Sequence, residues 1–149
     1  MAKFNFRLQS VLKVKSQQED NLKNELGKAI RKLEDEKRKL AKLEDELSSL
    51  SAKFNEKAKK ATVKKLIEYK EYLSLLTPRI KSQKENVNCA ALNVDKIREE
   101  LLQAVKERQI LEKLKEKKKE EFLLEEKKLE QKINDEIVSF SHKDGSSGD

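Results

Sequence analysis

The 149-residue sequence has very little of what most enzymes and secreted proteins need. It contains one cysteine, one histidine, one proline, three glycines and no tryptophan, and only 5% of its residues are aromatic. A single cysteine excludes an intrachain disulfide and a Cys-x-x-Cys metal pair, and the scarce glycines provide no phosphate-binding loop. No apolar run is long enough for a signal peptide or a membrane span, so we expect a cytoplasmic protein.

The residue types that usually carry catalysis or bind metals are almost absent. His142, the only histidine, has no partner at metal-ligand or triad spacing, and Cys89 has no histidine near it. Carboxylates are abundant, but exposed helices surround them with water and lysines, so nothing separates their pKa values as acid–base catalysis requires. We therefore expect no enzymatic activity, no cofactor and no metal.

Charged residues dominate what is present. They make up 42% of the chain, and its 35 Lys and Arg are interleaved with 28 Asp and Glu, for a net charge of +7. Such mixing favours a solvated surface with many ion pairs over a basic stripe for nucleic acid. Good helix formers such as Lys, Glu and Leu fill the sequence, which predicts long exposed helices. The net charge alone leaves a nucleic-acid or acidic-membrane binder as an alternative class.

Apolar residues recur at alternating steps of three and four, which is the seam of a coiled coil. The spacing from Gln18 to Leu22 to Leu26 shows two successive steps of four, which predicts a stutter. Beyond Leu114 the expected contacts become sparse. The first seam comprises Leu22, Leu26, Ala29, Leu33, Leu40, Leu43, Leu47, Leu50 and Phe54. The second seam comprises Ile80, Val87, Val94, Ile97, Leu101, Ala104 and Leu111. The sparse contacts that follow it are Phe122, Leu129, Ile133, Ile137 and Phe140.

Two interruptions separate the seams. One lies at residues 55–62, and the other is Pro78, which pushes the preceding Thr77 out of the α region. We predict an all-α fold, a long antiparallel two-helix coiled-coil hairpin, with a short helix at residues 63–76 if both interruptions are breaks. The turn lies near Lys60 in one register and near Tyr72 in the other. The predicted bounds are helices at about 4–56 and 80–141 with a tip at 57–79, a single domain over 1–142, and a flexible tail at 143–149.

Three stretches have either a structural or a functional interpretation. The first, FNFRLQSVL at residues 4–12, is apolar enough to pack on the C-terminal helix or to bind a partner. The second, LIEYKEYLSLL at 66–76, concentrates both tyrosines, and its helical spacing sets Tyr72 apart from the face of Tyr69. The third, ERQILEKLKEKKKEE at 107–121, is a solvated helix face or a surface for an encircling partner.

Four blocks together resemble the flagellar export protein family FliJ. They are FNFRLQSVL, EYKEYLSLLTPRIKSQ, ERQILEKLKEKKKEEF and EEKKLEQKINDEI, and they follow the family's order over residues 4 to 140. The resemblance implies a soluble component of the bacterial flagellar type III export apparatus, similar to the central stalk subunit of rotary ATPases. It also implies a location in the cytoplasm, peripherally associated with the inner membrane at the flagellar base.

The resemblance further implies three kinds of partner, and no active site in the chain itself. They are the hexameric export ATPase FliI, which hydrolyses the ATP, the export gate protein FlhA, and export chaperones. By similarity with the rotary stalk, we assign the ATPase contact to the end that holds both termini and the gate contact to the second stretch. The ATPase-binding residues are then Phe4, Phe6, Arg7, Leu8, Glu107, Arg108, Glu112, Lys113 and Lys115, and the gate-binding residues are Tyr69, Tyr72, Leu73 and Leu76.

Two further alternatives stay open at this point. The stalk protein of a virulence-type type III secretion system has a similar sequence pattern. A structural coiled-coil dimer would pair the seams of two chains, whereas the hairpin pairs them within one chain and predicts a monomer.

Overall fold

The computed structural model describes residues 2–57 and 62–146 and contains two long helices, α1 (Gln9–Lys57) and α2 (Val63–Ser146). No strand occurs within these residues. The chain divides into two compact units, Met1–Gln18 with Ala104–Asp149 and Glu19–Gln103. We call the first the terminal unit and the second the hairpin unit. The predicted single domain over residues 1–142 stays a prediction.

Local chemistry explains where the helices begin. Before α1, the Gln9 amide donates to the Phe6 carbonyl at 3.1 Å, and the Leu12 amide donates to the Leu8 carbonyl at 2.9 Å. Thr62 precedes α2, and its carbonyl accepts the Leu66 amide at 3.2 Å. Threonine is a favoured residue at this capping position.

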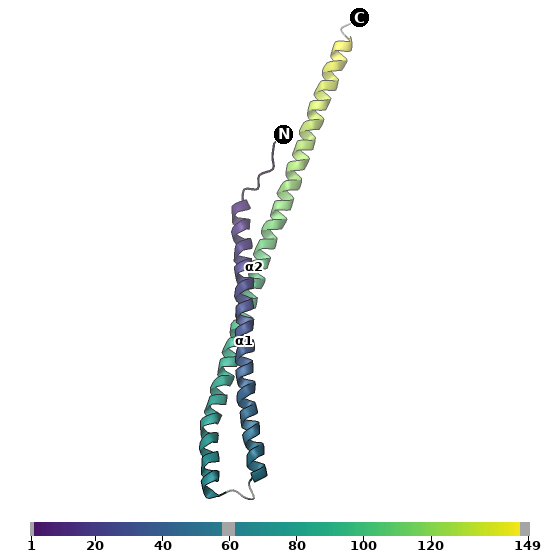
Figure 1. The fold of residues 1–149 in the computed structure, drawn as a ribbon. Helices are drawn as coiled ribbons and strands as arrows, with labels where there is room; N and C mark the ends of the chain where they lie inside the picture. The colour runs from purple at the N-terminus through teal and green to yellow at the C-terminus, as the bar shows by residue number, and fades with distance from the viewer. Residues whose placement is uncertain (1, 58–61, 147–149) are drawn as a thin grey trace. The chain divides into compact units, whose positions relative to one another are not determined.

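The hairpin unit is an antiparallel two-helix coiled coil, which confirms the predicted fold class (Figure 1). Most of its buried and half-buried side chains follow steps of three and four along both helices, so each helix presents one continuous face to the other. Val94 is the largest fully buried side chain. On α1 these positions are Glu19, Leu22, Leu26, Ala29, Leu33, Glu36, Leu40, Leu43, Leu47, Leu50 and Phe54, and on α2 they are Tyr69, Leu73, Leu76, Ile80, Gln83, Val87, Ala90, Val94, Ile97 and Leu101.

A polar layer within the seam shows the register. Gln83, only 8% exposed, donates through Nε2 to the Glu36 carbonyl at 2.9 Å and also to the Glu36 carboxylate. Glu36 and Gln83 are equally distant in sequence from a point near Lys60, so the register centred on Tyr72 is wrong. The predicted turn at Lys60 lies outside the described residues, but α1 ends and α2 begins on either side of it.

The predicted break at Pro78 is also wrong, because α2 continues through this residue. Pro78 is exposed, so water can reach the Ser74 carbonyl that loses its amide partner. Leu76 is 2% exposed and Ile80 is 8% exposed, so the seam holds the helix on both sides of the proline. The separate short helix at 63–76 therefore does not exist.

Replacing Pro78 with alanine is expected to stabilise the hairpin unit. Alanine restores one helical hydrogen bond and removes the ring clash, while it also adds freedom to the unfolded chain. We expect the free energy of unfolding to rise by about 1 to 3 kcal/mol. Urea unfolding followed by circular dichroism measures this, and an unchanged or lower midpoint would contradict it.

The predicted stutter is absent as well. Gln18 is exposed, whereas Glu19 is 5% exposed and lies three residues before Leu22. Its carboxylate pairs with Lys23 at 3.3 Å, so a charged side chain occupies a seam position that the apolar pattern could not identify.

The end of α2 differs from the prediction. The helix continues to Ser146, so residues 143–146 of the predicted flexible tail are helical, and 147–149 lie outside the described residues. Lys143 lies in the last turn, where the negative end of the helix dipole stabilises a cation.

Candidate partner-binding surfaces

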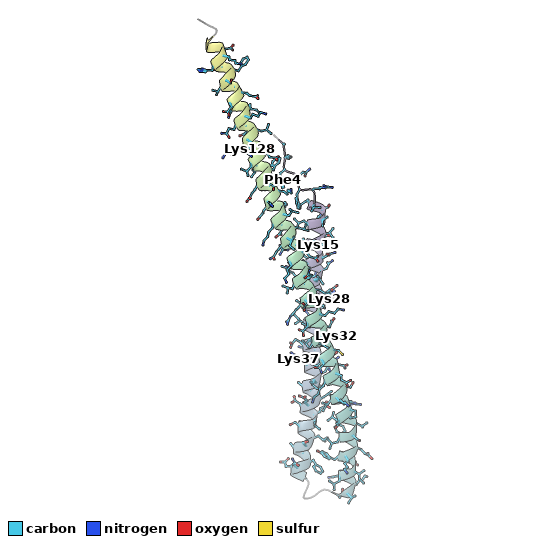
Figure 2. The ribbon with its side chains drawn as sticks, turned by 180° about the vertical axis from the view of Figure 1, so that it is seen from behind. Phe4, Lys15, Lys28, Lys32, Lys37 and Lys128 are labelled. Carbon is cyan, nitrogen blue, oxygen red and sulfur yellow. The ribbon has the colours of Figure 1, made fainter. Side chains whose placement is uncertain are left out.

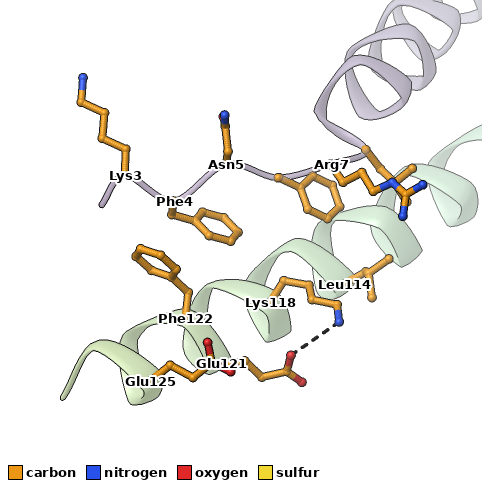
Figure 3. Close-up of a pocket in the computed structure, with 11 residues that line it drawn as sticks. Lys3, Phe4, Asn5, Arg7, Leu114, Lys118, Glu121, Phe122 and Glu125 are labelled. Carbon is orange, nitrogen blue, oxygen red and sulfur yellow. Dashed lines mark ion pairs between the residues drawn. The ribbon is translucent and has the colours of Figure 1, made fainter. Parts of the chain in front are cut away.

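The terminal unit joins the N-terminal segment, residues 2–8, to the second half of α2. The ring of Phe4 faces the ring of Phe122 at a centroid distance of 5.6 Å and a tilt of 51° (Figure 3). Tilted aromatic pairs of this kind contribute about 0.5–1.5 kcal/mol beyond their buried area. Lys3 and Asn5 point away from α2, so the segment turns its apolar side toward the helix and its polar side outward (Figure 3).

A groove of about 650 Å³ lies between this segment and α2. Lys118 and Glu121 form an ion pair of 3.5 Å at its rim. Its apolar surface comes from five side chains, Phe4, Phe6, Leu8, Leu114 and Phe122. An apolar groove with a charged rim suits contact with a protein side chain, because the apolar part supplies burial and the rim supplies orientation.

Two ion pairs use residues that we assigned to the ATPase contact. Lys15, labelled in Figure 2, donates to Glu107 at 2.9 Å within the terminal unit. Arg108 pairs with Glu112 at 2.8 Å. These side chains are partly exposed, so each pair contributes only about 0 to 1 kcal/mol. Glu107 and Arg108 therefore already have partners within this chain.

The structure brings all nine predicted ATPase-binding residues into the terminal unit. These residues differ in how far their side chains are exposed to a partner. Arg7, Glu112 and Lys113 are exposed, and the remaining six are half-buried. Phe122 and Lys15 also belong to this surface, although neither was predicted as part of it. Phe122 belonged to the predicted seam, but no local signal could pair it with a phenylalanine near the other end of the chain.

The predicted gate-binding residues all lie in the hairpin unit, and most of them face inward. The Tyr69 ring stacks on Phe54 at 4.0 Å, and its hydroxyl lies 3.5 Å from the Ser51 hydroxyl. Leu73 is half-buried and Leu76 is 2% exposed. Tyr72 alone is turned outward, at 45% exposed, as the helical spacing predicted.

Tyr72 lines a shallow groove with Leu50 and Lys53 of α1, and Leu75 lies beside it on α2 at about 60° around the helix. Leu75 is 62% exposed, whereas the exposed Ile67 lies on another side of α2, in a groove that continues to Pro78. We call the surface formed by Tyr72 and Leu75 the tyrosine patch.

Among residues 2–57 and 62–146, no group of three or more potential ligands could hold a metal ion. Neither described helix contains a stretch long and apolar enough to cross a membrane.

Comparison with known protein families identifies the family of this chain. The family model described as the flagellar FliJ protein matches residues 4–147, which is nearly the whole chain. No curated protein and no solved structure matches the chain significantly.

Proposed function

Because the chain belongs to the FliJ family of coiled-coil proteins of flagellar type III export, we propose that it acts as a central stalk. In this role it binds the ring of the export ATPase FliI and couples that ring to the export gate protein FlhA and to export chaperones. The family match carries the proposal. It favours the flagellar system over the virulence-type alternative, and the antiparallel pairing within one chain favours a hairpin over a parallel structural dimer.

The terminal unit is the part of the chain that we assign to the ATPase ring. It holds both chain ends, as the rotary-stalk comparison requires, and it combines the Phe4–Phe122 groove with exposed charges. Arg7 and Lys113 are its exposed cations among the assigned residues. A shaft inside a ring of similar subunits benefits from many weak, screened contacts, each worth about 0 to 1 kcal/mol, because no single subunit then traps it.

The tyrosine patch is the part that we assign to the export gate. Tyr72 has an apolar ring body and a polar tip, a combination enriched in protein interfaces. The assigned residues Tyr69, Leu73 and Leu76 support the patch from inside, because they hold α2 against α1. The protein then works in the cytoplasm, associated with the inner membrane at the flagellar base through its partners.

Charge reversal in the terminal unit tests the ATPase contact. We expect Arg7→Glu with Lys113→Glu to abolish most of the stimulation of FliI ATPase activity, because two cations offered to the ring become anions. Both side chains are exposed, so the helical content measured by circular dichroism should not change. The measurement is steady-state ATP hydrolysis by purified FliI with increasing amounts of each variant.

A matched control makes the same charge change elsewhere. Lys81→Glu with Lys84→Glu alters two exposed lysines of the hairpin unit, and we expect it to keep full stimulation. Equal stimulation by the two double variants would place the ATPase contact outside Arg7 and Lys113. A wild-type chain that neither binds nor stimulates FliI would overturn the proposed function itself.

A further inference from the structure

The N-terminal segment lies on α2 with side chains that alternate in exposure. Residues 2–6 have no regular secondary structure, and from residue 3 to residue 8 each exposed polar side chain is followed by a half-buried apolar one. A period of two is the pattern of an extended chain that places one face on a surface. The half-buried residues are Phe4, Phe6 and Leu8, and the exposed ones are Lys3, Asn5 and Arg7.

Apolar contacts hold this segment to α2. The side chains of the described residues 2–8 form no hydrogen bond or ion pair with the rest of the described chain. Leu8 directly precedes α1, which fixes that end of the segment, whereas the other end is a chain terminus. The ring of Phe4 packs on that of Phe122 near this terminus, as Figure 3 shows. The outer half of the segment therefore depends on the Phe4–Phe122 contact.

Phe122 has an unusual environment for its part of α2. From residue 116 to residue 145, only Phe122 and Glu126 are half-buried, and every other position is exposed. The neighbouring Leu123 is 55% exposed. Because α1 begins only at Gln9, the N-terminal segment supplies the cover of Phe122. Phe122 is thus the apolar side chain of this stretch that holds the segment.

The outer face of the segment is cationic. Lys3 and Arg7 are exposed, and the first acidic residue of the sequence is Glu19. Within the described part of the chain, neither cation has an ion-pair partner, whereas Lys15 of α1 is paired with Glu107. Two unpaired cations on one outer face suit carboxylates of a partner.

Holding the segment in place before binding increases affinity. A loose chain terminus loses conformational freedom when a partner orders it, and this loss opposes binding. In this chain the contact with Phe122 orders the segment beforehand. Phe122 can therefore affect the binding of a partner that it does not touch.

We infer that Phe122 is a positioning residue for the ATPase contact. It holds the N-terminal segment through Phe4, so that Lys3 and Arg7 face acidic side chains of FliI. This inference rests on the proposed function and deepens it, because it gives Phe4 the role of a support within the chain and gives the direct contact to the two cations.

Electron paramagnetic resonance of the free chain tests the support. A nitroxide label is placed on Asn5→Cys in a chain with Cys89→Ser, since Asn5 is exposed and points away from α2. Phe122→Ala should narrow the spectrum to that of a mobile terminus, which moves on the nanosecond scale. Phe122→Tyr keeps the ring, and Leu123→Ala changes an exposed neighbour, so both should keep the wild-type spectrum. An unchanged spectrum in Phe122→Ala would overturn the inference.

Titration of FliI with unlabelled chains tests the positioning role. Phe122→Ala should raise the concentration for half-maximal stimulation of ATP hydrolysis about tenfold and leave the maximal stimulation unchanged, because Lys3 and Arg7 are still present. Phe122→Tyr and Leu123→Ala should match the wild-type chain, and the helical content of all variants should be equal. A mobile segment with an unchanged half-maximal concentration would overturn the inference while the proposed function stands.

A double-mutant cycle separates support from direct contact. Phe4→Ala should have the same effect as Phe122→Ala, and the two substitutions together should have no larger effect than either one, because both break a single contact. Additive effects would mean that Phe4 touches FliI itself and would contradict the inference. Failure of the wild-type chain to stimulate FliI would overturn the proposed function, whereas the spectra of the free chain do not depend on FliI.

Discussion

Replacing Leu76 with aspartate is expected to unfold most of the hairpin unit at 25 °C. Leu76 is 2% exposed in the seam between α1 and α2, and the substitution removes its apolar contacts and places a carboxylate there. Truncating a buried leucine to alanine alone costs about 2–5 kcal/mol, and burial of an unpaired charge adds to that cost. We expect a loss of at least about 4 kcal/mol, at the upper end for single substitutions.

Leu75 provides an adjacent control for this prediction. It is 62% exposed, so Leu75→Asp should change the free energy of unfolding by less than about 0.5 kcal/mol. Urea unfolding of the three chains, followed by circular dichroism, measures the difference. If Leu75→Asp were as destabilising as Leu76→Asp, the side of α2 that faces α1 would be assigned incorrectly.

Tyr72→Ala is expected to abolish capture of this chain by FlhA while the hairpin stays folded. Tyr72 is the outward-facing residue among the four assigned to the gate, and truncating a tyrosine at the centre of an interface often costs 2 kcal/mol or more in binding, about a 30-fold loss of affinity. Because Tyr72 is 45% exposed, its removal should change the helical content little. Pull-down with purified FlhA, followed by titration, measures the effect.

Leu92→Ala is the control for this experiment. Leu92 is an exposed apolar residue of α2 that lies in the hairpin unit but outside the tyrosine patch. It should retain wild-type binding. If Tyr72→Ala binds FlhA as tightly as Leu92→Ala does, the gate contact lies elsewhere on the chain. Substituting Leu76 cannot answer this question, since a change there disrupts the hairpin itself.

The predicted helix break at Pro78 was wrong because the local effect of proline on the backbone is weaker than the packing along the whole seam. The restriction that proline imposes on Thr77 acts locally and costs a few kcal/mol. The seam on both sides of it, at Leu76 and Ile80, is buried against α1 and outweighs that cost. Nothing in the local sequence reports the strength of a contact with a helix that is distant along the chain.

The polar seam positions were missed for a similar reason. Glu19 and Gln83 do not match an apolar template, so the pattern passed over them and produced a false stutter at Gln18. In the structure, Gln83 hydrogen-bonds to Glu36 on the opposite helix and Glu19 pairs with Lys23. A polar residue can enter a coiled-coil seam when a partner satisfies it, and that partner is visible only after the chain folds.

The sequence by itself determined the fold class, the family and the absence of a glycine-rich loop or a disulfide. Each of these depends on composition, on local periodicity or on the order of motifs along the chain. Tertiary structure alone decided the register centred near Lys60 and the contact of Phe4 with Phe122. A repeat of three and four residues recurs identically at every heptad, so it allows several registers. Only contacts between distant residues, such as Glu36 with Gln83, select one of them.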